Sequence, residues 1–356
     1  MRSLSDTLER LARLNRHAYP HSPTSRLADL EAFGSNPGSL AAKLYVPMTL
    51  GARPALVVVL HGCTQTAAGY DDSSGWSRLA DEFGFLLLYP QQIQANNANL
   101  CFNWFLPDDI RRGHGEALSI WQMIETVVMK HGIDRKRIFA TGLSAGGAMA
   151  NVMLATYPDV FAGGAIIAGL PYGTASTIPE AFDRMRAHGL PQPAELAGLL
   201  ARASPSVHSW PTVSIWHGTA DKTVSPTNAV ALRDQWRGVH KLYREPTTTE
   251  ITGRDTVRVW EDDTGQVLVS YHAISGMGHG LPIDARNARE KVAPFMTDVG
   301  ISSTSQIAYE WGLTPSFDRR QVDTPEVDLP GPYIHAHSLG IKETIEAALK
   351  SAGLLK

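Results

Sequence analysis

The hydrophobic positions along the chain alternate between two kinds of segment. Short apolar runs rich in β-branched residues predict strands, and longer segments with apolar residues every third or fourth position predict helices. Strands are predicted at residues 40–47, 54–60, 85–90, 137–142, 163–168, 211–217, 256–260 and 267–275. Helices are predicted at residues 74–83, 114–131, 145–156, 224–238 and 340–350. This alternation indicates an α/β fold with a mostly parallel central sheet and helices on both faces.

Three segments lie outside the alternation. Residues 1–30 form an N-terminal extension, whose first 16 residues carry leucines at helical spacing and predict a short amphipathic helix. Residues 171–210 lie between two predicted strands and contain short helical patches, so we expect them to form a small cap. Residues 314–356 begin with a Pro- and Asp-rich stretch that is expected to wrap the surface before the final helix. No internal repeat divides the 356 residues, and their number suits a single domain spanning 1–356.

The most informative motif is Gly-Leu-Ser-Ala-Gly at residues 142–146, between a predicted strand and a predicted helix. A G-x-S-x-G sequence in this position is typical of a nucleophile elbow, a sharp turn that exposes one serine. The turn strains the backbone of Ser144, and the glycines let strand and helix approach closely. The N–H of Ala145 is then free at the helix N-terminus, where it can stabilise an oxyanion. Ser144 is therefore the candidate nucleophile.

An acid and a histidine follow the serine in the chain order that such a site requires. Asp221 comes just after the predicted strand at 211–217, and His279 lies in a glycine-rich loop after the strand at 267–275. Each residue has another interpretation. Asp221 could cap the helix at 224–238, since Asp is a favoured N-cap, and His279 is one of thirteen histidines. Three residues at three strand ends in the right order favour a Ser-His-Asp triad over coincidence.

A second oxyanion donor is expected on the loop after the strand at 54–60, which is apolar throughout and therefore predicted to be buried on both faces. This loop begins His61-Gly62-Cys63, and its histidine–glycine pair is similar to the oxyanion loops of esterases. In such loops the backbone N–H after the glycine, here that of Cys63, points into the site. The thiol then has no chemical task, because Ser144 already explains the nucleophile.

Other histidines and acids fit structural roles better. His272 lies inside a predicted strand and is expected to face a neighbour, whereas His217 lies at a strand end and could reach the cleft. Asp255, together with the aspartates at 262 and 263, flanks a predicted hairpin and is interpreted as a turn and solvent residue.

The net charge and the composition of the chain limit the kinds of partner that it is expected to bind. The formal net charge of −3 gives no long-range attraction to nucleic acid or anionic membranes, and no apolar run is long enough for membrane insertion. His335 and His337 have no Cys or acidic companions at ligand spacing, so no metal site is predicted.

Cys63 and Cys101 could be free in the cytoplasm or bridged in an oxidising compartment. The N-terminus lacks the apolar core of a signal peptide, which favours the cytoplasm.

Four motifs together resemble one known family. They are His-Gly-Cys-Thr-Gln at 61–65, Cys-Phe-Asn-Trp-Phe at 101–105, Gly-Leu-Ser-Ala-Gly-Gly at 142–147 and Gly-Met-Gly-His at 276–279. This set is similar to the poly(3-hydroxybutyrate) depolymerase-like esterases of the α/β-hydrolase superfamily, a family that also includes feruloyl and acetylxylan esterases. The resemblance extends from about residue 30 to about residue 285 and implies the α/β-hydrolase fold with a small cap insertion.

The resemblance also assigns roles to the candidate residues. It implies that Ser144, Asp221 and His279 form the triad, and that the backbone N–H groups of Cys63 and Ala145 form the oxyanion hole.

Residues 101–105, Cys-Phe-Asn-Trp-Phe, form an aromatic loop that the resemblance places at the border of the same cleft as the oxyanion loop. From the resemblance we expect a disulfide between Cys63 and Cys101 under oxidising conditions. Asn103 and Trp104 are candidates for lining the substrate groove, although Trp104 could equally be core packing.

The implied activity is two-step ester hydrolysis that needs no metal or organic cofactor. The expected substrates are aliphatic polyesters or 3-hydroxybutyrate oligomers, with a feruloyl or acetylxylan esterase as the alternative; a serine peptidase or a non-catalytic binding protein fits less well. Family members are often secreted, which points to an extracellular location, against the missing signal peptide. Since no appended polymer-binding module is visible, we expect weak action on crystalline polymer. The sequence predicts neither the acyl and alcohol preference nor the oligomeric state.

Overall fold

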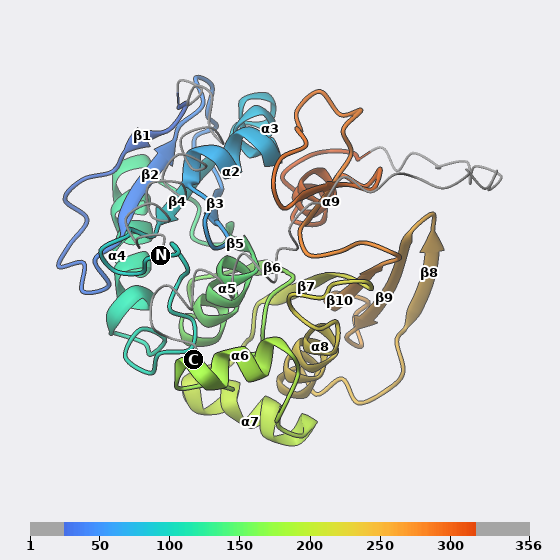
Figure 1. Ribbon diagram of the computed structural model, residues 1–356. Helices are drawn as coiled ribbons and strands as arrows, with labels where there is room; N and C mark the ends of the chain where they lie inside the picture. Colours follow the sequence, from blue (N-terminus) through green and yellow to red (C-terminus); the bar gives the residue numbers. More distant parts are fainter. Residues whose placement is uncertain (1–24, 318–356) are drawn as a thin grey trace, which may run out of the picture.

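The computed structural model of the chain describes residues 25–317 (Figure 1). The helices predicted within residues 1–16 and 340–350, and the histidines at 335 and 337, lie outside the described residues.

Within residues 25–317, ten strands form one sheet, in the order β1-β2-β4-β3-β5-β6-β7-β10-β9-β8. Their bounds are β1 Ala28–Asp29, β2 Ala41–Tyr45, β3 Leu56–Leu60, β4 Leu86–Gln91, β5 Ile138–Leu143, β6 Gly163–Ile167, β7 Thr212–Gly218, β8 Thr248–Thr252, β9 Asp255–Glu261 and β10 Val267–Ile274. The consecutive strands from β4 to β10 in this order pair in parallel, and the pairs at the two ends of the sheet are antiparallel. The predicted mostly parallel sheet is therefore confirmed, and every strand predicted from the sequence has a counterpart.

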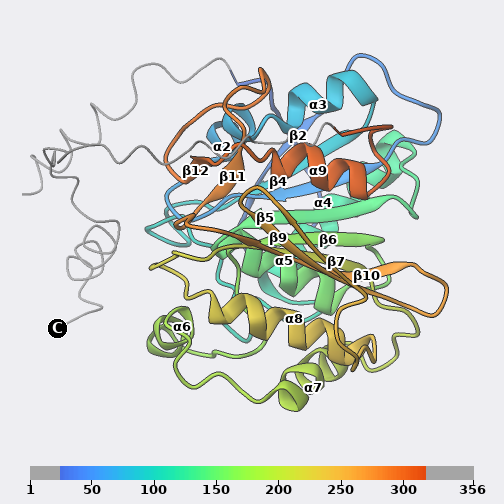
Figure 2. The same cartoon turned by 90° about the vertical axis from the view of Figure 1, so that its right-hand side faces the viewer.

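The sheet is covered by helices on both faces (Figures 1 and 2). The helices are α2 Ala67–Ser74, α3 Trp76–Phe83, α4 Gly115–His131, α5 Ala145–Thr156, α6 Ile178–Met185, α7 Pro193–Ala203, α8 Thr227–Val239 and α9 Ser303–Glu310. One core cluster joins the sheet to α4, α5, α7 and α8, and a second joins its other face to α2, α3 and α9. Within β3, successive residues alternate between the two clusters, as the two-residue period of a strand requires. This explains why the strand is apolar at every position.

The sequence prediction missed several short elements. The helix predicted at 74–83 begins at Trp76, because Gly75 has a φ of 79° that ends α2 and separates the two helices. Strands β1 and β8 extend the sheet edges, and β11 Leu281–Ile283 pairs with β12 Met296–Asp298 in a separate two-stranded sheet. Strands β1, β11 and β12 have two or three residues, too few for a recognisable alternation, and β8 has no buried residue that would mark it.

The segment 171–210 contains α6 and α7. Helix α7 packs against α8, and the two lie side by side in both views (Figures 1 and 2). The C-terminal end of α6 is tied to the loop before α8, because the N–H of Ser225 donates to the carbonyl oxygen of Met185 at 2.7 Å. The segment is thus joined to the chain that follows β7.

Candidate active site

Ser144 occupies the turn between β5 and α5. Its φ of 58° and ψ of −119° lie in a region that residues with a side chain rarely adopt. The turn is held from both sides: the N–H of Ser144 donates to the carbonyl oxygen of Ile167 in β6 at 2.9 Å, and its carbonyl oxygen accepts from the N–H of Ala148 at 2.8 Å. Ser144 is half-buried, so a bound molecule can reach its hydroxyl.

The glycines around Ser144 are required by close backbone approach. A Cβ on Gly146 would collide with the carbonyl oxygen of Leu60 in β3, and a Cβ on Gly142 would collide with the carbonyl oxygen of Gly146. Strands β3 and β5 and helix α5 therefore meet at distances that only glycine permits.

Ser144, His279 and Asp221 meet in the structure. His279 Nε2 lies 2.9 Å from Ser144 Oγ, and His279 Nδ1 lies 2.7 Å from Asp221 Oδ2. They follow β5, β10 and β7, parallel strands whose carboxyl ends open on one edge of the sheet. Because a carboxylate only accepts, Nδ1 carries the imidazole proton and Nε2 is left to accept the serine proton. This is the geometry that general-base activation of a serine requires.

The carboxylate of Asp221 is fully occupied. Oδ1 accepts the N–H groups of Thr223 and Val224, at 2.8 and 2.9 Å. Oδ2 faces His279 and also lies 3.2 Å from His217 Nε2. Burial opposes ionisation of this carboxyl, but hydrogen bonds from the two histidines outweigh it and hold the pKa of Asp221 well below its ordinary value. Asp221 therefore both organises the turn before α8 and faces His279, and α8 itself begins after Pro226.

His217 lies behind Asp221 rather than in the cleft, which corrects the expectation that it could reach the cleft. Its side chain is fully buried, and Nε2 lies 2.9 Å from the carbonyl oxygen of Val224 as well as 3.2 Å from Asp221 Oδ2. Both neighbours are acceptors, so Nε2 carries the proton and is shared between them. Nδ1 is buried with no hydrogen-bond partner among the described residues. His217 thus serves as a fixed donor to the acid, a contact that no sequence pattern indicated.

The loop after β3 lies against the serine turn. A Cβ built on Gly62 would be 3.6 Å from Ser144 Cβ. The N–H of Gly62 donates to Gln65 Oε1 at 2.8 Å, while no acceptor within residues 25–317 takes the N–H of Cys63. Ala145 is the first residue of α5, and the first N–H groups of a helix have no partner within it. Two unused donors are therefore available near Ser144.

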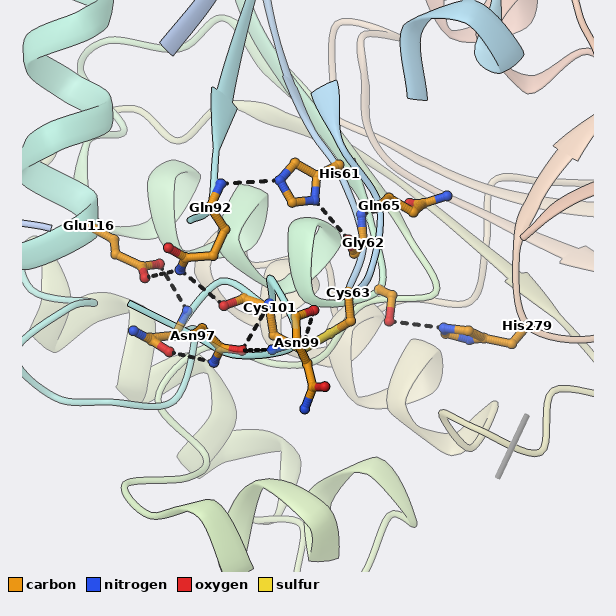
Figure 3. Close-up of a disulfide and its surroundings, with 12 residues drawn as sticks. His61, Gly62, Cys63, Gln65, Gln92, Asn97, Asn99, Cys101, Glu116 and His279 are labelled. Atoms are coloured by element: carbon orange, nitrogen blue, oxygen red, sulfur yellow. Dashed lines mark hydrogen bonds between the residues drawn. A yellow bond between two sulfur atoms is a disulfide. The ribbon is translucent and has the colours of Figure 1, made fainter. Parts of the chain in front are cut away.

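The predicted disulfide is present in the structure. Cys63 and Cys101 are bonded, with their Cα atoms 4.3 Å apart (Figure 3). Beside the bond, the N–H of Thr64 donates to the carbonyl oxygen of Asn99 at 2.7 Å. The loop after β3 is thus joined to the loop after β4 both covalently and by hydrogen bonding.

A buried polar network contacts both loops (Figure 3). Gln92 at its centre donates from its side chain to Glu116 Oε1 at 2.6 Å and to the carbonyl oxygen of Cys101 at 3.0 Å, and from its backbone to His61 Nε2 at 3.2 Å. Burial raises the pKa of the fully buried Glu116 to about 8, although Oε2 also accepts the N–H of Asn103 at 2.9 Å. Burial lowers the pKa of His61 to about 4, so the imidazole is neutral. Sequence reasoning did not identify Glu116 or Gln92.

Asn103 and Trp104 both have structural partners. Asn103 Oδ1 accepts from the side chain of Asn97 at 3.2 Å. Trp104 is 6 % exposed, belongs to the core cluster with α4 and α5, and packs edge-on against Phe105 with ring centroids 5.5 Å apart. These contacts favour the packing interpretation of Trp104, and its substrate role stays a prediction.

A second aspartate–histidine pair is buried in the sheet. Asp255 Oδ2 lies 2.9 Å from His272 Nδ1, and the His272 ring stacks on Trp216 with centroids 3.6 Å apart. Asp255 is 3 % exposed and is the first residue of β9, so its interpretation as a turn and solvent residue was wrong. The turn between β9 and β10 does contain the aspartates at 262 and 263, as expected. His272 does face strand neighbours, as expected.

Other features lie away from this site. A cavity of about 440 Å³ is bordered by the β8–β9 turn, the β11–β12 loop and α9, and its lining includes none of Ser144, Asp221 and His279. Within residues 25–317, no cluster of His, Cys, Asp and Glu could hold a metal ion. No helix in the same range is long and apolar enough to cross a membrane.

The chain matches known proteins over most of its length. Residues 40–254 match the family model described as Esterase PHB depolymerase. The chain is 42% identical over 301 residues to poly(3-hydroxyalkanoate) depolymerase C of Paucimonas lemoignei, covering 83% of this chain and 72% of the relative. It is 33% identical to feruloyl esterase B of Talaromyces stipitatus, covering 72% and 73%.

A solved structure shares the fold. The acetyl xylan esterase from Aspergillus awamori superposes with a TM-score of 0.69 at 26% identity, covering 81% of this chain and 99% of that chain. Together with the family match, this makes the chain a member of the esterase PHB depolymerase family: a carboxylic ester hydrolase with the α/β-hydrolase fold.

Proposed function

We propose that Ser144, His279 and Asp221 are the catalytic triad and that they hydrolyse carboxylic esters through an acyl-enzyme. The observation that carries this proposal is the continuous hydrogen-bond chain from Asp221 Oδ2 through the imidazole to Ser144 Oγ. His279 takes the serine proton as Oγ attacks the ester carbonyl carbon and then gives it to the departing alcohol oxygen. In the second half, His279 activates water, which attacks the acyl carbon and releases the acid and Ser144.

The negative charge formed on the carbonyl oxygen needs donors near Ser144. We assign this role to the N–H groups of Cys63 and Ala145, since one is unused by the described residues and the other begins a helix. The disulfide and the Gln92 network support the assignment, because they fix the loop that carries Cys63. Every step uses side chains and backbone groups of this chain and needs no cofactor.

The proposed substrates are aliphatic polyesters or 3-hydroxybutyrate oligomers. The support is the 42% identity to a protein named poly(3-hydroxyalkanoate) depolymerase C. A feruloyl or acetylxylan esterase is the second candidate, favoured by the 33% identical feruloyl esterase B and by the fold of the acetyl xylan esterase. We keep Asn103 and Trp104 as candidate groove residues. We also keep the segment 171–210 as a cap in one catalytic domain, since the end of α6 within this segment contacts the loop after Asp221.

A substrate panel tests both levels of the proposal. Initial rates are measured on p-nitrophenyl butyrate, soluble 3-hydroxybutyrate oligomers, methyl ferulate and acetylated xylan, with the wild type and Ser144→Ala. We expect hydroxybutyrate oligomers to give the highest kcat/KM among the natural ester types, and Ser144→Ala to lose about a million-fold in kcat on every substrate. Activity retained by a folded Ser144→Ala protein would refute the triad. Faster cleavage of ferulate or acetylxylan than of oligomers would transfer the assignment to the second candidate.

A further inference from the structure

Phe295 lies directly beside the catalytic base. It precedes β12, in the loop that starts after β11, and its ring meets the His279 ring at 81° with centroids 6.1 Å apart. Phe295 is half-buried, so part of it remains open to a bound molecule. An aromatic edge-to-face contact of this kind places an apolar surface next to the imidazole.

The position of Phe295 is fixed by its backbone. Its φ of 64° is rarely adopted by a bulky residue, so the surrounding structure must hold it in place. Its carbonyl oxygen accepts the N–H of Leu281 at 2.8 Å, and a Cβ on Gly280, the residue after His279, would lie 2.7 Å from that same oxygen. The loop of the base and the backbone of Phe295 are therefore packed against each other.

The same loop is tied to the oxyanion loop through one side chain. Gln65 Oε1 accepts the N–H of Gly62 at 2.8 Å, and Gln65 Nε2 donates to the carbonyl oxygen of Pro294 at 3.4 Å. Figure 3 shows Gln65 and His279 on one side of Gly62, away from Glu116 and Gln92. Phe295 is thus positioned relative to both the base and the proposed oxyanion donors.

We propose that Phe295 is a specificity-determining residue that contacts the alcohol portion of the ester. This inference rests on the proposed function. The imidazole that delivers a proton to the departing oxygen must lie next to the alcohol group, whereas the acyl carbon sits on Ser144. A phenyl ring packed against that imidazole therefore faces the alcohol side. It selects an aliphatic alcohol portion, such as the next hydroxyacyl unit of a polyester, over a strongly hydrated one.

Two matched series of esters test the proposal. In the first, the acyl group is butyrate and the alcohol grows from ethanol to hexanol; in the second, the alcohol is ethanol and the acyl group grows from acetate to hexanoate. In the wild type, kcat/KM should increase with alcohol length. In Phe295→Ala, the ratio of kcat/KM for hexyl butyrate to that for ethyl butyrate should fall about tenfold, because the added methylenes lose their apolar contact. The acyl-length ratio should keep its wild-type value.

Two further variants keep the test decisive. Val292→Ala is the matched control, since Val292 lies in the same loop and is 65% exposed; both ratios should stay within twofold of wild type. Phe295→Leu keeps an apolar cover on His279 and should lower the alcohol-length ratio less than Phe295→Ala does. It also replaces Phe295→Ala if that variant does not fold, as judged by its thermal transition.

Three results would overturn the inference. They are an unchanged alcohol-length ratio in a folded Phe295 variant, an equal loss on all esters of both series, and a loss confined to the acyl series. Failure of the proposed function is recognised separately. It would appear as activity in Ser144→Ala or as a preference for ferulate or acetylxylan, and both series can be measured whichever natural substrate is correct.

Discussion

The disulfide between Cys63 and Cys101 should stabilise the fold by a calculable amount. It links residues separated by 38 positions, and closing a loop of this length removes about 13 cal/mol/K of chain entropy from the unfolded state. The corresponding free energy is about 4 kcal/mol at 298 K. With a melting entropy of about 2.1 cal/mol/K per residue, the described part of the chain has about 0.6 kcal/mol/K, so Tm should fall by about 6 °C without the bond.

The effect on activity should be smaller than the loss of an oxyanion donor. Removing one such donor outright costs about 10²–10³ in kcat. Without the bond, the oxyanion loop would still be held by the hydrogen bond from Thr64 to Asn99, and the partner loop by the contacts of Gln92 and Asn97 with the Cys101 backbone. We therefore expect kcat to fall by no more than about tenfold, with the KM for a short ester nearly unchanged.

The measurements are a calorimetric Tm and kcat on p-nitrophenyl butyrate for the double variant Cys63→Ser/Cys101→Ser, with and without reductant. Wild type in reductant should match the double variant, and reductant should not shift the double variant further. A Tm loss below about 1 °C would contradict the loop-entropy reasoning. A thousandfold loss of kcat would mean that the hydrogen bonds beside the bond do not hold the loop.

Three further predictions concern titratable side chains. His279→Gln should lower kcat at least about 10⁴-fold, because His279 contacts the Ser144 hydroxyl. His272→Gln should keep kcat within tenfold but lower Tm, because His272 is buried against Asp255 and does not contact the serine. If His272→Gln were the inactive variant and His279→Gln the active one, the base would be assigned to the wrong residue. His217→Phe should lower kcat about tenfold and move the acid limb of the pH–rate profile to higher pH, because the Asp221 carboxylate with one donor fewer stabilises the imidazolium of His279 more strongly. His217→Gln keeps a donor and should restore most activity. An unchanged pH–rate profile in His217→Phe would mean that His217 contributes only packing. Glu116 has a pKa raised to about 8, so its contribution to the free energy of unfolding is complete below the unfolded pKa near 4.5 and is lost as pH rises through about 8. In urea titrations between pH 5 and 9, the free energy of unfolding should therefore fall less in Glu116→Gln than in wild type, and an equal fall in both proteins would contradict this.

The sequence was enough to predict the candidate site residues whose positions follow from the order and direction of the strands. A run of buried strand residues followed by glycine and a polar residue marks a strand end, and parallel strands bring their ends to one edge. Ser144, Asp221 and His279 each follow such a run, so their meeting needed only the strand type and the chain order. Strands β3, β5 and β6 were found because burial on both faces leaves an unbroken apolar run, whereas β9, nearer the sheet edge, alternates between more and less buried positions.

Contacts made by side chains across the fold could not be predicted in this way. Gln65 and Pro294 are 229 positions apart. Gln92 directly follows β4, and Glu116 lies 24 positions later in the first turn of α4. Gln65, Gln92 and Glu116 are polar residues with no distinctive local sequence pattern, and only the folded chain brings them to their hydrogen-bond partners. The same holds for Phe295, whose strained backbone has no glycine or asparagine to announce it.

The two aspartate–histidine pairs show where pattern and structure separate. His272 and His279 are seven positions apart, and each has an aspartate within hydrogen-bond distance, yet one reaches Ser144 Oγ. His272 lies inside β10, where side chains stand perpendicular to the sheet, so its ring packs beside side chains of the neighbouring strands and stacks on Trp216 of β7. His279 lies beyond the strand, where the loop can turn its ring over the sheet edge toward the serine. The place of an aspartate–histidine pair relative to the strand end therefore decides whether its imidazole reaches Ser144, and the hydrogen bond within the pair carries no such information.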